Sequence, residues 1–113
     1  MVLENFTFKH KNKTHTLKIK PCKNLLQKAT GLMFRKNSPP LLFIYNKPTR
    51  EPIHSFFCKP FIAIWFNKNK IIDVKLVNPF NPLIKPKQEF DKLLEIPENN
   101  NFFKKFTTEK ENI

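Results

Sequence analysis

Ten prolines divide this chain into short segments, and a single glycine is available for tight backbone turns. Proline interrupts a helix interior because it lacks an N–H and clashes with the preceding turn. Only residues 22–38, residues 61–78 and the tail after Pro97 are free of proline for long enough to hold a helix of several turns. This spacing excludes a helical bundle. The lone Gly31 also excludes a Rossmann fingerprint and a P-loop, since both use several glycines to bring backbone close to phosphate.

Four segments in the first two thirds of the chain have the patterns of β-strands. Residues 6–8 and 15–20 alternate apolar and polar side chains, with lysines on the polar face of the second run, and residues 11–13 suit a hairpin turn between them. Residues 41–45 and 61–66 are continuous apolar runs, typical of strands that are buried on both faces. The pattern therefore predicts an N-terminal hairpin and two central strands.

Two further strands are expected in the second half. Residues 70–77 place Ile72, Val74 and Leu76 on one face and Asp73 and Lys75 on the other, after a short hairpin turn at residues 67–69. Residues 89–96 are expected to form the next strand, with Phe90, Leu94 and Ile96 on one side of it; a helix is the alternative for this segment.

One helix is expected to start near Cys22, directly after Pro21. Leu25, Leu26 and Ala29 recur at helical spacing, and Gly31 can supply a left-handed stop. The fold class is therefore mainly β (α+β). We expect a small, closed or partly closed, antiparallel β-barrel-like domain with one short helix, and residues 1–113 forming a single domain.

The positive charge is concentrated in the first half of the chain. The net charge is +12, and residues 5–50 contain no acidic residue. Unopposed positive charge attracts phosphate backbones. The candidate polyanion-contacting residues are Lys9, Lys11, Lys13, Lys18, Lys20, Lys23 and Lys28. Nucleic acid or another polyanion is thus a candidate partner; the alternative is a compositional bias toward Lys, Asn, Ile and Phe.

The sequence favours a cytoplasmic location. No run approaches the roughly 18 apolar residues of a membrane helix, and the N-terminus lacks the pattern of a secretory signal. Cys22 and Cys58 lie far apart in the sequence, and we expect both to be reduced thiols. No membrane partner is expected, and the oligomeric state is open.

Several short motifs occur in the order found in one family. They are Gly31–Arg35 (GLMFR), the apolar run at 41–45, Ile53–Phe57 (IHSFF), Pro79-Phe80, and Leu93–Pro97 (LLEIP). Together they resemble the domain-of-unknown-function 192 family, also called uncharacterised protein family 0127, in its archaeal-type branch. The resemblance divides the chain into an N-terminal hairpin (1–20), a family core (21–97) and a C-terminal segment (98–113).

The resemblance implies a small β-barrel-like fold with a short helix and no established activity. The chain departs from the family pattern at three places. Residues 56–59 stand in place of the family's common W-M-x-N-T motif. Ile62 stands where the family usually has an acidic residue, two positions after the proline that opens the strand. Glu98-Asn99 stand where the family has a glycine after the LLEIP motif. This member is therefore expected to keep the scaffold while altering any family site.

Catalytic and metal-binding arrangements are disfavoured. His54 and Cys58 are four residues apart, which in a strand is about 13 Å, too far for shared zinc ligation. Ser55 would point away from its neighbour His54, Cys58 is expected to be a packed thiol, and no pair of carboxylates suits acid–base catalysis. No catalytic residue, metal or other cofactor is assigned.

A ligand pocket is the remaining candidate. Arg35 closes the family motif, and a guanidinium there can hold an anion or a backbone carbonyl. The residues expected to line such a pocket are Met33, Arg35, His54 and Lys59. The sequence thus favours a small cytosolic, non-enzymatic binding or accessory module. A basic RNA- or DNA-binding protein and a small-ligand or enzymatic pocket near Arg35 and His54 are the alternatives.

Overall fold

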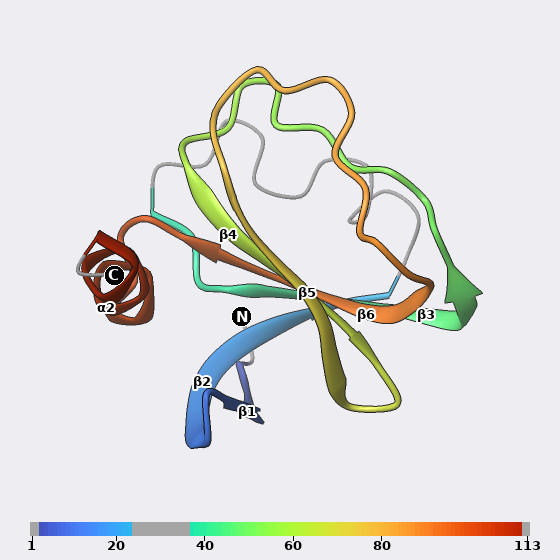
Figure 1. Cartoon of the computed structure of the whole chain (residues 1–113), viewed down its shortest axis with the longest axis horizontal. Coiled ribbons are helices and arrows are strands. Elements are labelled where there is room, and N and C mark those ends of the chain that lie inside the picture. Colours follow the sequence, from blue (N-terminus) through green and yellow to red (C-terminus); the bar gives the residue numbers. More distant parts are fainter. Residues whose placement is uncertain (1–2, 24–36, 112–113) are drawn as a thin grey trace.

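The structure, a computed structural model, describes residues 3–23 and 37–111. In this part of the chain six strands form one curled sheet, and one helix follows them (Figure 1). The elements are β1 (Glu4–His10), β2 (Lys13–Cys22), β3 (Leu41–Thr49), β4 (Phe61–Asn67), β5 (Lys70–Val77), β6 (Phe90–Pro97) and α2 (Asn101–Glu111). The predicted mainly β, barrel-like fold is confirmed.

The strand order is β1-β2-β3-β6-β4-β5, so the two edge strands are β1 and β5. All neighbouring strands are antiparallel except β2 and β3, which pair in parallel over Lys20–Cys22 and Leu41–Phe43. The sheet curls into a half-barrel (Figure 1). The expectation of a purely antiparallel barrel therefore needs one correction, at the β2–β3 pair.

Both predicted hairpins have two-residue turns with positive φ angles. Lys11 and Asn12 have φ values of 52° and 64°, and Lys68 and Asn69 have values of 50° and 66°. Turns with φ > 0 at both central residues match the right-handed twist of the flanking strands. The structure thus places both turns within the segments that the sequence indicated.

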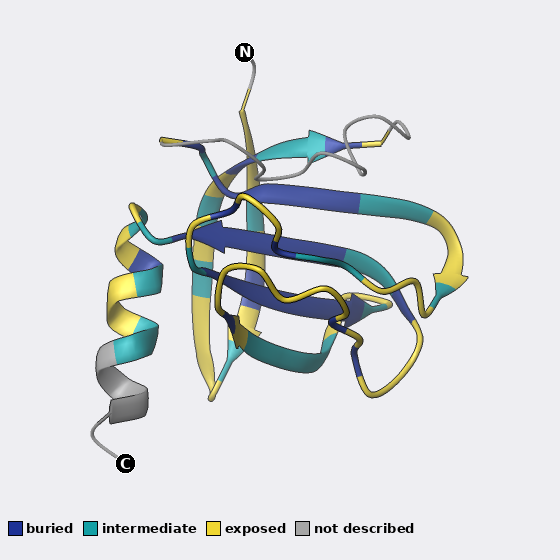
Figure 2. Cartoon of the chain, turned by 90° about the horizontal axis from the view of Figure 1, so that it is seen from above, coloured by how far each residue is buried: buried dark blue, intermediate teal, exposed yellow. Residues whose placement is uncertain are grey.

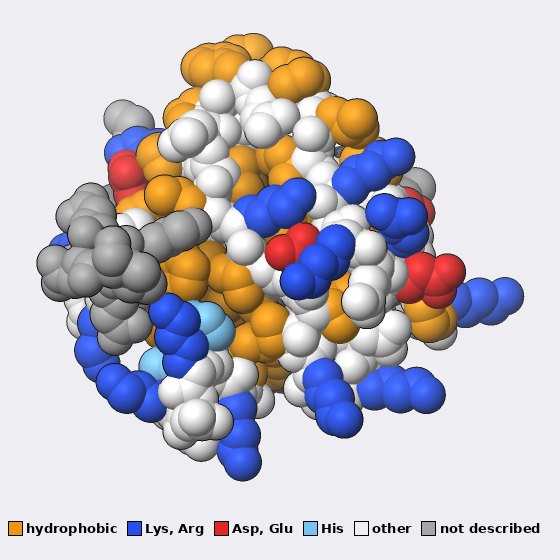
Figure 3. All heavy atoms as spheres, viewed as in Figure 1, with side chains coloured by type: hydrophobic (Ala, Val, Ile, Leu, Met, Phe, Trp, Pro, Cys, Tyr) orange, Lys and Arg blue, Asp and Glu red, His pale blue; other side chains and the backbone are white. Residues whose placement is uncertain are grey.

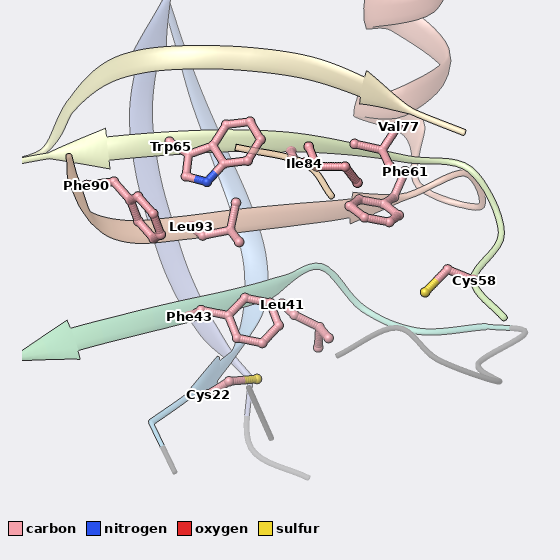
Figure 4. Close-up of a cluster of buried hydrophobic side chains, with 11 residues drawn as sticks. Cys22, Leu41, Phe43, Cys58, Phe61, Trp65, Val77, Ile84, Phe90 and Leu93 are labelled. Atoms are coloured by element: carbon pink, nitrogen blue, oxygen red, sulfur yellow. The ribbon is translucent and has the colours of Figure 1, made fainter. Parts of the chain in front are cut away.

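The central strands are covered on both faces, as Figure 2 shows by their dark blue colour. All six residues of Phe61–Phe66 are buried, which confirms the prediction from the continuous apolar run. One face packs under the loops that carry Ile53, Cys58 and Ile84, and Figure 4 shows this cluster. The other face packs against the β1–β2 hairpin and α2, through Phe8 and Phe102. The core is therefore two clusters separated by the sheet.

Two predicted side-chain alternations are wrong, each because the register shifts. In β5 a bulge opposite Trp65 and Phe66 leaves Ile72 as an extra residue, so Ile72 packs on the loop-covered face and Val74 on the other. The pairing between β6 and β3 shifts register between Ile44 and Thr49, the residue opposite Phe90. Phe90 therefore lies in the same cluster as Leu93, whereas Leu94 and Ile96 lie in the other cluster.

The helix expected from Cys22 does not begin there. Strand β2 continues through Pro21 and Cys22, which pair with Leu42 and Phe43; proline is tolerated near a strand end, where its missing N–H is least needed. The rest of that prediction falls on residues 24–36, outside the described residues. The described helix is α2, at whose start the Asn100 side chain accepts a hydrogen bond from the Phe102 N–H, at 2.8 Å.

Candidate functional site

The β1–β2 hairpin has an apolar face and a polar face. Its register pairs Phe8 with His15 and Phe6 with Leu17, and Phe8, Phe6 and Leu17 pack into the core. The opposite face consists of six exposed side chains: Asn5, Thr7, Lys9, Thr14, Thr16 and Lys18. The two threonine hydroxyls of Thr7 and Thr16 are hydrogen-bonded at 2.8 Å. This face of the hairpin is therefore polar and cationic, and none of its six side chains is acidic.

A groove of about 490 Å³ lies between this hairpin and the start of β5. Thr7, Lys9 and Thr14 line its hairpin side, and Asn69 and Lys70 line the other side. Lysines from two different hairpins thus face one groove, together with hydroxyl and amide groups. These are the side chains with which proteins commonly contact phosphate oxygens.

A smaller pocket of about 130 Å³ lies between the hairpin tip and α2. His10, Lys11, Lys13 and His15 line it from the hairpin, and Phe102, Lys105 and Phe106 line it from the helix. Figure 3 shows the two histidines, in pale blue, beside lysines on this part of the surface. We call the groove and this pocket, with the polar face of the hairpin between them, the basic surface.

Lysines of the basic surface are not neutralised by neighbouring acids. Lys9, Lys11, Lys13 and Lys18 have no ion pair with any residue that the structure describes, where the one salt bridge joins Lys59 to Glu98 at 3.9 Å. A polyanion could therefore contact these ammonium groups without first displacing a protein carboxylate.

The structure places most of the predicted polyanion-contacting lysines on or next to this surface. Lys9, Lys11, Lys13 and Lys18 are exposed on the hairpin; Lys20 is half-buried in β2, and Lys23 is exposed directly after it. Lys28 lies outside the described residues.

Sequence reasoning missed the residues that complete the basic surface from elsewhere in the chain. Lys70 comes from β5 and Lys105 from α2, and both lie far from the hairpin in sequence. The spacing of Phe102 and Phe106, one helical turn apart, could have indicated that α2 docks through this face. His10 and His15 required the hairpin register, which places them on the same face.

The predicted ligand pocket is only partly covered by the structure. Met33 and Arg35 lie outside the described residues. His54 Nδ1 accepts a hydrogen bond from the Phe56 N–H at 3.2 Å, so this ring stabilises its own loop, and Lys59 points toward Glu98. A pocket that joins His54 and Lys59 to the family motif stays a prediction.

Ser55 joins the two loops that cover one face of the sheet. Its side chain is fully buried, and its hydroxyl donates a hydrogen bond to the Asn78 carbonyl at 2.6 Å and accepts one from the Asn81 N–H at 2.8 Å. The adjoining Phe57 and Phe80 have positive φ values of 59° and 62°, costly for bulky residues. Ser55 therefore contributes to holding a strained loop pair.

We expect Ser55→Ala to lower the free energy of unfolding by about 2 kcal/mol, because the Asn78 carbonyl and the Asn81 N–H each lose a buried partner. Urea denaturation measures this change. Ser38→Ala is the matched control, since Ser38 is also buried but donates only to the carbonyl of its neighbour Pro39. Equal losses in the two variants would contradict the assigned role of Ser55.

Beneath these loops lies a buried carboxyl group. Glu95 is 5% exposed, on the central strand β6, between Leu41 of β3 and Ala63 of β4. Burial raises the pKa of Glu95 to about 8. Among the described residues no salt bridge reaches this carboxyl group, and the Trp65 indole N–H on the same face of the sheet has no hydrogen-bond partner there.

The Cys58 thiol is unsuited to nucleophilic chemistry. Burial, and then the Glu95 carboxylate, raise the pKa of Cys58 to about 11, so the thiol is protonated at neutral pH. The predicted packed thiol is confirmed by its burial in the cluster with Phe61. Burial, followed by the Glu51 and Glu95 carboxylates, likewise raises the pKa of Tyr45 to about 12.

The described part of the chain offers neither a metal-binding cluster nor a membrane-spanning helix. No group of three or more histidine, cysteine or acidic side chains there could hold a metal ion. No described helix has both the length and the apolar character that a membrane crossing requires.

Comparisons with known proteins give similarity in fold only. No protein-family model and no curated protein matches this sequence. A crystal structure of a protein of unknown function from Novosphingobium aromaticivorans is similar, with a TM-score of 0.74 and 17% identity over 84% of this chain and 73% of that chain.

A second similar crystal structure is that of a candidate transcription regulator from Sinorhizobium meliloti. It has a TM-score of 0.70 and 16% identity, covering 80% of this chain and 76% of that chain. The fold is thus shared with these two proteins, whereas identities this low carry no residue roles across.

Proposed function

We propose that this protein is a binding module that contacts the phosphate backbone of nucleic acid with its basic surface. The observation that carries this proposal is the groove that Lys9 and Lys70, from different hairpins, both line together with Thr7 and Thr14. A phosphate backbone lying in this groove could contact lysines from both hairpins.

The chemistry of the surface favours contact with the backbone over reading of bases. Lysine and threonine side chains bind phosphate oxygens whatever the base sequence, and the described residues that line the groove do not include the arginine that makes most specific contacts to guanine. We therefore expect little sequence preference and a strong dependence on salt. Similarity to a candidate transcription regulator agrees with this proposal but concerns the fold.

The proposal predicts that Lys9→Gln/Lys70→Gln weakens binding to a duplex DNA or RNA oligonucleotide roughly tenfold at low salt. It should also lower the slope of log K against log salt by about 2, since two phosphate contacts are lost. Fluorescence anisotropy at several salt concentrations measures both quantities.

The matched control is Lys47→Gln/Lys87→Gln, which removes the same charge from exposed positions that do not line the groove. It should leave the salt slope nearly unchanged. Absence of oligonucleotide binding at low salt would overturn the proposal, and so would equal losses in the two double variants.

Membership of the domain-of-unknown-function 192 family is also proposed, on the sequence motifs alone. The motif Leu93–Pro97 lies on β6 and the apolar run at 41–45 on β3, two strands that pair in the sheet. The family adds no activity to the proposal.

A further inference from the structure

The pocket between the hairpin tip and α2 is smaller than the groove and is lined by aromatic rings, so we consider its ligand separately. Ring contacts define its walls: His15 meets Phe102 edge-on at 4.8 Å between centroids, and His10 lies 5.7 Å from Phe106. Phe102 and Phe106 are themselves stacked at 6.2 Å. Aromatic rings from the hairpin and from α2 therefore form part of the pocket wall.

Three lysines line the pocket, two from the hairpin and one from α2. Lys11 and Lys13 flank the hairpin turn, and Lys105 approaches from α2, so positive charge comes from two sides. None of the described residues that line the pocket is acidic. Ammonium and imidazole N–H groups are donors to oxyanions, and the apolar walls reduce screening by water.

The size of the pocket limits what can enter. Its volume of about 130 Å³ is below the roughly 300–1,000 Å³ of pockets that hold drug-sized ligands. A space of this size suits one small group, such as a tetrahedral oxyanion, better than a drug-sized ligand.

We infer that this pocket binds a terminal phosphate group, the phosphomonoester at one end of a nucleic-acid strand. A phosphodiester within a strand carries a sugar on both sides, whereas a terminal phosphate carries a sugar on one side and leaves more oxygen atoms free to accept hydrogen bonds. The terminal group also carries more negative charge, about −1.5 to −2 near pH 7 for a phosphomonoester. This inference rests on the proposed function, because the strand would extend from the pocket along the basic surface.

The test compares two single-stranded RNA oligonucleotides of one sequence, one with a 5′-phosphate and one with a 5′-hydroxyl, each labelled at the 3′ end. We expect the intact protein to bind the phosphorylated strand roughly tenfold more tightly, and Lys105→Gln to reduce this ratio to about 2 or below. Lys104→Gln is the matched control, since Lys104 is exposed on the same helix but does not line the pocket. It should preserve the ratio.

A titration with inorganic phosphate separates this inference from the proposed function. Phosphate should shift the ring proton resonances of His10 and His15 in the intact protein, and much less in Lys105→Gln. Phosphate shifts without any oligonucleotide binding would support the pocket and overturn the proposed function. Equal binding of the two strands would overturn the pocket and leave the groove, and equal effects of Lys104→Gln and Lys105→Gln would likewise overturn it.

Discussion

Raising the pH from about 5 to about 8 should make this protein progressively easier to unfold, through Glu95. Burial raises the pKa of Glu95 from an ordinary 4.5 to about 8 in the folded protein. Between these values the folded state keeps a proton that the unfolded chain has released. The free energy of unfolding contributed by this group therefore falls as the pH rises, by at most about 1.4 kcal/mol per pH unit.

The total loss is on the order of a few kcal/mol, which is a large part of the stability of a domain of this size. It is complete once the pH exceeds the folded pKa of about 8, because Glu95 is then ionised in both states. Below about pH 4.5 the group is protonated in both states, and the full stabilisation is present. Urea denaturation at a series of pH values measures this dependence.

Substitution by glutamine isolates the contribution of Glu95. Glu95→Gln cannot ionise, so the difference between the variant and the natural protein should favour the variant increasingly from pH 5 to pH 8. Glu98→Gln is the control: Glu98 is near in sequence, partly exposed and paired with Lys59, and the variant should keep the pH dependence. A constant difference between Glu95→Gln and the natural protein over this pH range would show that the folded pKa is not raised.

The burial of Glu95 could not be predicted from the strand pattern. Leu94 and Ile96 on either side of it suggest an amphipathic strand, in which Glu95 would point to solvent. Instead β6 lies between β3 and β4, and the loops cover its second face. The strand order and the paths of the loops decide the burial of Glu95, and neither is encoded in the local alternation.

The hairpin could be predicted, because local signals agree there. Alternation over residues 15–20 and a turn segment at 11–13 fixed both the strands and the exposed lysine face. The bulge at Ile72 could not be predicted, because no residue type in this part of β5 marks the position of the extra residue. A short-range pattern thus predicts an element well when its pairing partner is adjacent in sequence.

The same limit applies to the basic surface. Lys9, Lys11 and Lys13 were predicted from the charge of the first half alone, whereas Lys70 and Lys105 belong to segments with nearly balanced charge. Only the packing of β5 and α2 beside the hairpin brings them together. The lysine cluster could therefore be predicted, and the groove and pocket could not.

Phe8→Ala should lower the free energy of unfolding by about 3–5 kcal/mol, the range for truncating a buried phenylalanine. Phe8 is 4% exposed and joins three parts of the fold. Its ring lies 5.4 Å from His15 in β2, 5.8 Å from Phe66 in β4 and 5.6 Å from Phe102 in α2. Removing the ring leaves a cavity where the hairpin, the sheet and the helix meet.

The position of Phe8 also predicts a local effect that a general loss of stability would not produce. Because Phe8 contacts both His15 and Phe102, two rings that line the phosphate pocket, its truncation should loosen α2 and the pocket together. Amide exchange in α2 should accelerate more than exchange in β4 and β6, measured under conditions where the variant remains folded.

Two further variants calibrate this result. Phe8→Leu keeps part of the buried volume and should cost clearly less than Phe8→Ala. Phe80→Ala removes the same atoms from a side chain that is 62% exposed, and it should change the free energy of unfolding by about 0.5 kcal/mol or less. If Phe8→Ala were no more destabilising than Phe80→Ala, the hairpin would not be packed onto the sheet through Phe8. The inward face of the hairpin, on which the pocket depends, would then have to be reassigned.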